Sequence, residues 1–264
     1  MICFPNAKIN LGLNVVSKRT DGYHNIETCF YPVPWTDVLE IIPSDQLTFN
    51  PSGLSIPGNA DSNLCLKAYY LLKEEFDLPP VSIYLHKVIP MGAGLGGGSS
   101  DGAYTLKLLN ELFALKLSTQ KLETLSGKLG SDCPFFIQNQ PAFATGTGTD
   151  FSPVNVSLKG MFIALTHPRI HVSTWEAYAG INPQKPAQPI TEIINQPLSY
   201  WRENLINDFE SSIFSNHPAI KQIKEDFYTH GAVYSAMSGS GSCVFGIFEN
   251  EAPQLQCDAY FPLD

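Results

Sequence analysis

Residues 90–101 read Pro90-Met91-Gly92-Ala93-Gly94-Leu95-Gly96-Gly97-Gly98-Ser99-Ser100-Asp101. Residues 81–86 before it alternate apolar and polar side chains as in a strand, and leucines recur at helical spacing after it. The pattern predicts a strand, a glycine loop and a helix in succession. Backbone N–H groups at a glycine-rich helix start suit a phosphate. The alternative is a flexible turn whose serines cap the helix.

The loop also matches the GxGxxG pattern of dinucleotide-binding folds at residues 92–97. Such a fold needs a second strand ending in an acidic residue about twenty positions later, whereas residues 111–115 here lie in or just after the predicted helix. A Walker A loop needs Gly-Lys-Ser/Thr after the glycines, and the sequence has none there. The loop therefore predicts a phosphate cradle of another family, with a nicotinamide-dependent dehydrogenase as an alternative.

The rest of the chain mixes strands and helices, which predicts an α+β fold. We expect helices from an N-cap at Ser62 to about Phe76 and over residues 120–128. Proline-rich residues 180–197 predict an irregular connection. The expected strands cover residues 8–16, 28–32, 37–42, 81–86, 161–166, 232–237 and 243–248.

Composition narrows the class of protein. At 264 residues the chain is about 1.8 times a typical 150-residue domain, and its formal charge of −9 disfavours binding to nucleic-acid phosphates. Six cysteines are scattered singly, and the sequence shows neither a signal-peptide pattern nor an apolar run of membrane-spanning length. We therefore expect a cytoplasmic protein that binds no membrane and no nucleic acid.

Three separated segments together resemble one superfamily, that of the galactokinases, homoserine kinases, mevalonate kinases and phosphomevalonate kinases. They are the Pro5-Asn6-Ala7-Lys8 start, the glycine loop, and Met237-Ser238-Gly239-Ser240-Gly241-Ser242. Within it, four stretches are most similar to the kinases that act on 4-diphosphocytidyl-2-C-methyl-D-erythritol. These are Asp21-Gly22-Tyr23-His24, residues 94–101, Gly130-Ser131-Asp132-Cys133-Pro134-Phe135-Phe136 and Asn207-Asp208-Phe209-Glu210.

The resemblance implies a two-domain small-molecule kinase fold with the active site in the interdomain cleft. It implies an ATP-binding domain over residues 1–150, a substrate-side domain over residues 151–264, and a boundary between them. The implied reaction moves the γ-phosphoryl group of ATP to the 2-hydroxyl of 4-diphosphocytidyl-2-C-methyl-D-erythritol, with Mg²⁺, on the non-mevalonate route to isoprenoid precursors. The sequence gives no oligomeric state.

The resemblance also implies the site residues. The catalytic pair falls on Lys8 and Asp132. Cofactor binding falls on Asn63, Lys87, Pro90, Met91, Gly92, Ala93, Gly94, Leu95, Gly96, Gly97, Gly98, Ser99 and Ser100. Substrate binding falls on Asn10, Tyr23, His24, Tyr178, Ser238, Gly239, Ser240 and Gly241.

Each role has a simpler alternative. Asp132 can take the proton of the acceptor alcohol, but Ser131 or Asp132 can equally cap a helix. Lys8 can stabilise the transferred charge, or it can be a charge at a sheet face. The Tyr23-His24 turn and the 238–242 loop can be ordinary hairpin turns. For Mg²⁺ the sequence offers only Ser99 or Ser100 as a candidate ligand and leaves the metal site unknown.

Two further functions stay open from the residues. Another small-alcohol kinase of the superfamily, of homoserine or mevalonate type, shares the three main segments. A non-catalytic nucleotide-binding regulator can keep the loop without the chemistry, although the presence of both Lys8 and Asp132 disfavours it.

Overall fold

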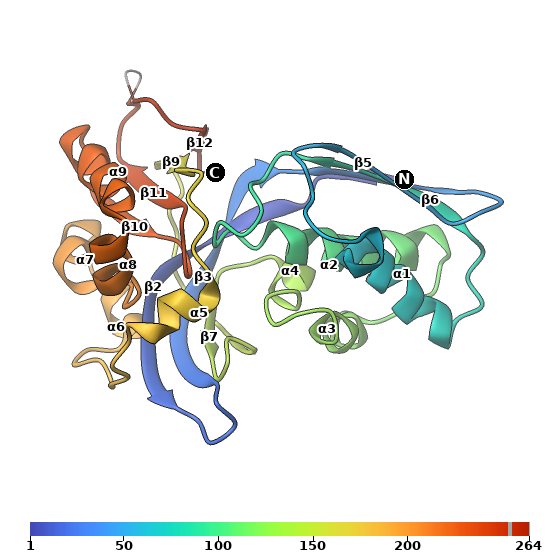
Figure 1. The fold of residues 1–264 in the computed structure, drawn as a ribbon, viewed down its shortest axis with the longest axis horizontal. Coiled ribbons are helices and arrows are strands. Elements are labelled where there is room, and N and C mark those ends of the chain that lie inside the picture. Colours follow the sequence, from blue (N-terminus) through green and yellow to red (C-terminus); the bar gives the residue numbers. More distant parts are fainter. Residues whose placement is uncertain (253–254, 264) are drawn as a thin grey trace. The chain divides into compact units, whose positions relative to one another are not determined.

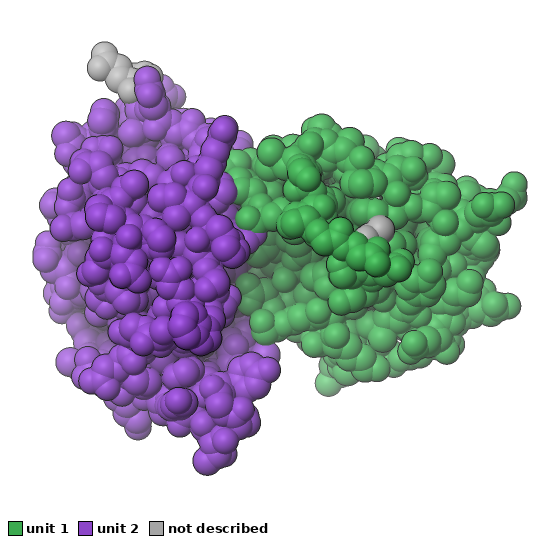
Figure 2. All heavy atoms as spheres, viewed as in Figure 1, with its two compact units in different colours: residues 1–7, 35–91, 96–140 green, residues 8–34, 92–95, 141–264 purple. Residues whose placement is uncertain are grey.

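The computed structural model describes residues 1–252 and 255–263. The chain forms two compact units (Figures 1 and 2). Unit 1 contains residues 1–7, 35–91 and 96–140, and unit 2 contains residues 8–34, 92–95 and the described residues from 141 onward. Over the described part of the chain, no helix combines the length and apolar character that a bilayer crossing requires.

Unit 1 is a sheet covered by helices. Its strand order is β1 (Ile2–Cys3), β4 (Val38–Pro43), β6 (Val81–Lys87) and β5 (Thr48–Gly53), with only β5 parallel to its neighbour. In β4 and β6 the side chains alternate, so that Leu39, Ile41, Ile83 and Leu85 are buried while Tyr84 is exposed. This period of two confirms the strands expected at residues 37–42 and 81–86.

The helices of unit 1 are α1 (Leu64–Glu75), α2 (Gly97–Leu112), α3 (Thr119–Gly127) and α4 (Phe135–Gln138), preceded by the short 3₁₀ helix η1 (Ala60–Ser62). Helix α2 packs against α1 and β4. The predicted N-cap at Ser62 is wrong. Asn63 caps α1, because its Oδ1 accepts a hydrogen bond from Cys65 N over 2.9 Å, and the Ser62 hydroxyl instead donates to Asn59 O.

Unit 2 holds two sheets. One has the order β2 (Asn6–Lys18), β3 (His24–Thr36), β7 (Ala142–Thr145) and β8 (Asp150–Pro153). The other is antiparallel, in the order β10 (Tyr234–Met237), β11 (Val244–Phe248), β9 (Phe162–Thr166) and β12 (Ala259–Pro262). Strands β10 and β11 confirm the hairpin expected around residues 238–242.

The helices in the described part of unit 2 are α5 (Thr174–Ala179), α6 (Ile190–Ile193), α7 (Leu198–Asn204), α8 (Glu210–Asn216) and α9 (Pro218–Thr229). Helix α9 lies on β10 and β11 and buries Phe227 against Phe248 in an edge-to-face contact (Figure 1). Helix α6 forms inside the segment that its prolines predict as irregular, starting directly after Pro189, which suits a helix N-terminus.

The division into units does not follow the predicted boundary after residue 150. Strand β3 pairs with β7, and β7 pairs with β8, so residues 8–34 pack with the later part of the chain. The two domain roles assigned from the resemblance remain predictions.

Candidate functional site

The N-terminus of α2 has the geometry of an anion cradle. Gly96, the N-cap, has a φ of 69°, a left-handed conformation that glycine adopts without strain. The first hydrogen bond of the helix runs from Ser100 N to Gly96 O over 2.9 Å. The N–H groups of Gly97, Gly98 and Ser99 therefore precede the helical hydrogen bonds and can bind an anion at the positive end of a 16-residue helix.

Gly98 leaves this cradle open. A Cβ built on Gly98 meets no atom within 4 Å, whereas a Cβ on Gly97 lies 2.9 Å from a methyl carbon of Ile89. The backbone at Gly97 thus packs closely against Ile89, and the backbone at Gly98 faces free space that a phosphate can fill. These features fit the ATP phosphates predicted for the loop.

A cavity of about 390 Å³ in unit 1 adjoins the cradle. Gly98 lines it together with Asn63 and Met91, which are also predicted to bind the cofactor. Apolar side chains supply much of the remaining wall, namely Phe49, Pro51, Ile56, Pro57 and Leu64. An apolar slot of this size that ends at a helix N-terminus suits a nucleoside whose phosphates sit at the helix start.

Lys87, which is also predicted to bind the cofactor, is not among the described residues that line this cavity. Its side chain is fully buried, and its ammonium pairs with Asp37 and, over 2.8 Å, with Asp101. The other oxygen of Asp37 accepts the N–H groups of Val88 and Ile89 over 2.6 and 2.8 Å. This network joins Lys87, the last residue of β6, to Asp101 in the N-terminal half of α2.

The two candidate Mg²⁺ ligands differ in accessibility. Ser100 is fully buried, and its hydroxyl has no hydrogen-bond partner among the described residues. Ser99 is half-buried at the start of α2. The described residues contain no cluster of three or more His, Cys, Asp or Glu side chains placed to hold a metal ion. Of the two serines, Ser99 is therefore the more accessible.

Asp132 lies in unit 1, in the turn between α3 and α4, and is half-buried. Ser131 Oγ donates to its Oδ1 over 3.4 Å. The N-cap of α4 is Pro134, so the alternative that Ser131 or Asp132 caps this helix is wrong.

Lys8 belongs to a buried polar cluster in unit 2. Its Nζ donates to Asn10 Oδ1 over 2.6 Å and to Gly94 O over 2.9 Å, and it lies 4.7 Å from the ring centre of Phe30. Ser238 Oγ donates to the same Gly94 oxygen over 2.9 Å. Four residues that the resemblance implies from three distant segments thus meet in one cluster. The alternative of a solvated sheet-face charge for Lys8 is wrong, because Lys8 is only 3% exposed.

The Tyr23-His24 turn is the tip of the β2–β3 hairpin, as its alternative predicts, and it also lines a cavity. Asp21 Oδ1 accepts the N–H of Tyr23 over 3.0 Å, which shapes the turn and lowers the pKa of the Asp21 carboxyl. Tyr23, His24 and Tyr178 all line a cavity of about 420 Å³ in unit 2. Three of the side chains predicted to bind the substrate therefore gather at one place.

Two of these aromatic side chains, His24 and Tyr178, stack on each other. The rings of His24 and Tyr178 stack with centroids 4.7 Å apart and planes inclined by 19°, so this structure leaves no room for a base between them. Tyr23 is 67% exposed and Trp175 is 80% exposed, and both line the same cavity. Sequence reasoning missed Trp175, although its position three residues before Tyr178 predicts the same face of a helix.

Two family models match the chain: GHMP kinases N terminal domain over residues 63–147 and GHMP kinases C terminal over residues 193–259. A protein of Cytophaga hutchinsonii named 4-diphosphocytidyl-2-C-methyl-D-erythritol kinase is 60% identical over 252 residues, which are 95% of this chain and 93% of that protein. The chain belongs to the 4-diphosphocytidyl-2-C-methyl-D-erythritol kinase family.

Solved structures agree with this membership. A crystal structure of 4-(cytidine 5'-diphospho)-2C-methyl-D-erythritol kinase superposes with a TM-score of 0.81 at 32% identity, over 93% of this chain and 89% of that one. A crystal structure of mevalonate kinase reaches a TM-score of 0.70 at 14% identity, over 94% and 91% of the two chains, and shares the fold alone. The resemblance read from the sequence is therefore confirmed in preference to a mevalonate-type kinase or a dehydrogenase.

For a 4-diphosphocytidyl-2-C-methyl-D-erythritol kinase, the predicted site residues are divided between the two units. Unit 1 holds Asn63, Met91 and Gly98 at one cavity and holds Asp132 elsewhere, whereas residues 92–95 of the predicted ATP loop belong to unit 2. Unit 2 also holds the Lys8 cluster and, separately, the aromatic cavity. The individual roles stay predictions.

Proposed function

We propose that this protein is an ATP-dependent kinase that phosphorylates the 2-hydroxyl of 4-diphosphocytidyl-2-C-methyl-D-erythritol. The observation that carries the proposal is the position of Gly98 in unit 1. Gly98 belongs to the N–H groups at the start of α2 and also lines the apolar cavity. This arrangement suits a nucleoside triphosphate, and family membership supplies the acceptor. We also propose that the protein works in the cytoplasm, where free thiols such as those of its six cysteines remain reduced.

The proposed chemistry needs a base for the acceptor hydroxyl and positive charge for the transferred group. Asp132 is the proposed base, which takes the hydroxyl proton as the oxygen bonds to the γ-phosphorus and ADP leaves. Lys8 is the proposed cation that stabilises the developing negative charge. When bound with ATP, Mg²⁺ would shield the phosphate charges, and Ser99 is the hydroxyl that would help to hold it.

The aromatic cavity of unit 2 is the proposed site for the cytosine ring. Tyr23 and Trp175 offer exposed ring faces on which a base can stack, and His24 offers ring nitrogens that can hydrogen-bond to its edge. The backbone of residues 238–241 is the proposed contact for the substrate phosphates.

The test is an ADP-release assay with Mg·ATP and a panel of acceptors: 4-diphosphocytidyl-2-C-methyl-D-erythritol, homoserine and mevalonate. Turnover with the cytidylated alcohol alone supports the proposal. Turnover with homoserine or mevalonate instead contradicts the proposed acceptor. ATP binding without turnover of any acceptor contradicts catalysis and favours the regulator.

A further inference from the structure

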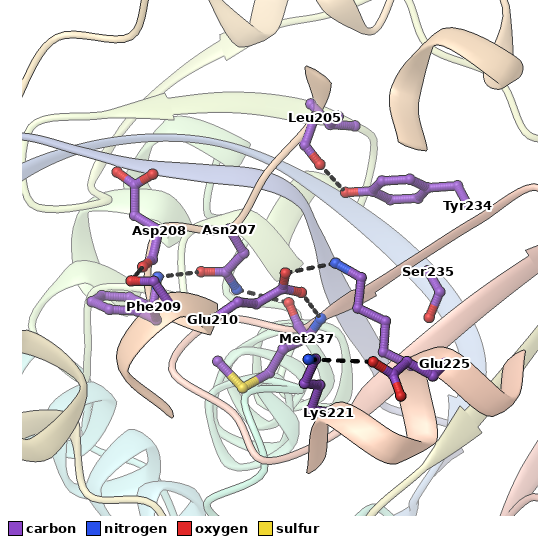
Figure 3. A network of polar contacts seen from close by, with 12 residues as sticks. Leu205, Asn207, Asp208, Phe209, Glu210, Lys221, Glu225, Tyr234, Ser235 and Met237 are labelled. Atoms are coloured by element: carbon purple, nitrogen blue, oxygen red, sulfur yellow. Dashed lines mark hydrogen bonds and ion pairs between the residues drawn. The ribbon is translucent and has the colours of Figure 1, made fainter. Parts of the chain in front are cut away.

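Residues 207–210, Asn-Asp-Phe-Glu, have no part in the proposed chemistry, yet their side chains are extensively bonded. They lie in unit 2 at the start of α8, and Asn207 is 3% exposed. Asn207 Nδ2 donates to two backbone carbonyls, those of Met237 and Gly239, each over 2.8 Å (Figure 3). These two carbonyls flank Ser238, so one side chain holds the backbone on both sides of it.

Glu210 binds the same loop through the backbone N–H of Met237. Its Oε1 accepts the N–H of Met237 over 2.7 Å, and its Oε2 accepts a hydrogen bond from Lys224 of α9 over 2.6 Å. In Figure 3 the Asn207 and Glu210 side chains both point toward Met237. The N–H and the carbonyl of Met237 are thus both bonded to this segment.

Asp208 ties the segment to strand β2. Its Oδ2 accepts the N–H of Val15 over 2.7 Å, its Oδ1 accepts from Asn14 Nδ2 over 3.2 Å, and its own N–H donates to Leu13 O over 2.9 Å. Lys8 and Asn10 lie on the same strand. The segment therefore fixes the 237–239 backbone with respect to the strand that carries the proposed catalytic lysine.

The fixed loop in turn reaches the acceptors of Lys8. Ser238 Oγ donates to Gly94 O, the oxygen that also accepts from Lys8 Nζ, and it lies 3.4 Å from Asn10 Oδ1. A Cβ on Gly94 would overlap the Ser238 carbonyl oxygen, so the two backbones are in close contact. We therefore expect a shift of Ser238 to alter the positions of Gly94 O and Asn10 Oδ1, two oxygens to which Lys8 donates.

We propose that Asn207 is a positioning residue for the phosphoryl transfer, acting through Ser238 and Gly94 on the Lys8 ammonium, with Glu210 as its partner. This inference rests on the proposed function for its kinetic consequence, but the effect on Lys8 itself needs no substrate. Asn207 does not touch the reacting atoms, and its role is to keep Lys8 in one geometry.

The first variant is Asn207→Asp, which keeps the size and the acceptor for Phe209 N but replaces the donor to both carbonyls. Trace labelling with acetic anhydride and peptide mass spectrometry measures the reactivity of the Lys8 amine in the free protein. We expect it to rise several-fold. With the cytidylated acceptor, we expect kcat to fall roughly 10- to 100-fold, as for a small misplacement of a catalytic group, while KM for ATP is unchanged.

Tyr234→Phe is the matched control. It removes a buried hydrogen bond of similar length, from Tyr234 OH to Leu205 O over 2.8 Å, in the same unit and without touching the 237–239 backbone (Figure 3). We expect a comparable loss of thermal stability with unchanged Lys8 reactivity and unchanged kcat. Equal effects of the two variants on Lys8 and kcat overturn the proposal, because the role of Asn207 is then only structural.

A double-mutant cycle with Ser238→Ala tests the route. If Asn207 acts through Ser238, the double variant loses less than the product of the two single losses in kcat. Independent losses that multiply overturn the proposal. If Asn207→Asp does not fold, Asn207→Ala removes the same donors without placing a carboxylate against two carbonyls and enters the same cycle. A wild-type protein that turns over none of the acceptors contradicts the proposed function, while the labelling still decides the role of Asn207.

Discussion

The Lys8 ammonium nitrogen lies 2.6 Å from the side-chain oxygen of Asn10, and both residues are buried. The ammonium also donates to Gly94 O over 2.9 Å and lies 4.7 Å from the ring centre of Phe30. Removing one partner of a buried charge destabilises a protein more than replacing both partners with apolar side chains.

This contact predicts that a second substitution can restore stability without restoring activity. We expect Asn10→Leu to lower the free energy of unfolding by about 1–3 kcal/mol, because it leaves a buried ammonium with fewer acceptors. The double variant Lys8→Met/Asn10→Leu should recover most of that stability, because both polar partners become apolar. Neither protein should show significant kinase activity. Urea unfolding and the ADP-release assay measure the two quantities, and a double variant less stable than Asn10→Leu contradicts this account.

Asp132→Asn tests the proposed base. The amide cannot take the hydroxyl proton, so we expect kcat to fall by roughly 10² or more, while ATP binding is nearly unchanged. Asp77→Asn, an exposed carboxylate in the same unit, is the control and should keep wild-type turnover. Near wild-type kcat in Asp132→Asn would mean that another group takes the proton.

Much of unit 1 could be predicted because its signals are local. Apolar and polar side chains alternate in β4 and β6 because one face of the sheet is buried. Five glycines within residues 92–98, followed by a helical pattern, predict a loop at the start of a helix. Residues such as Lys8 and Asp132 came from the resemblance, since nothing local separates them from an ordinary sheet charge or a helix cap.

What could not be predicted depends on long-range contacts. The pairing of β3 with β7 joins residues over 110 positions apart in sequence, as in Thr28 with Ala144, and it moves residues 8–34 into unit 2. Lys87 follows an alternating strand, but only the fold shows Asp37 and Asp101 on either side of its ammonium. The Asn207 contacts likewise need α8 and β10 to be placed together.

Gly98→Ala should separate stability from ATP binding. Because the added methyl meets no atom within 4 Å and alanine favours a helix, we expect the free energy of unfolding to rise by about 0.5 kcal/mol. The same methyl occupies the cradle, so KM for ATP should rise about tenfold. Gly127→Ala in α3, whose methyl makes only an ordinary contact at 3.8 Å, should leave KM for ATP unchanged. An unaltered KM in Gly98→Ala would place the phosphates elsewhere.

The Asp101 carboxyl should make stability depend on pH. Burial raises its pKa from 3.8 to about 7, although the Lys87 ammonium opposes the shift. The folded protein therefore holds this proton more tightly than the unfolded chain, and the free energy of unfolding contributed by Asp101 falls as pH rises from about 4 to about 7. Its slope should approach about 1 kcal/mol per pH unit at the steepest point.

Asp101→Asn removes this titration, so its unfolding free energy should depend less on pH over the same interval. Asp45→Asn, an exposed carboxylate of unit 1, should keep the wild-type slope. Urea unfolding at half-unit steps of pH measures both. A wild-type slope in Asp101→Asn would show that Asp101 is ionised throughout this range.

Trp175 gives a direct optical test of the aromatic cavity. The chain has three tryptophans, and Trp175 is 80% exposed while Trp35 and Trp201 are 6% and 2% exposed. Titration with cytidine 5'-diphosphate should shift or quench the emission of Trp175, because a base stacked on the indole displaces water from it. The change should persist in Trp201→Phe and vanish in Trp175→Phe.

In the kinase assay, Trp175→Ala should raise KM for the cytidylated acceptor about tenfold, as expected for one lost base-stacking contact, and leave KM for ATP unchanged. A fluorescence change that survives in Trp175→Phe, or an equal rise in both KM values, would mean that the cytosine does not lie against this side chain.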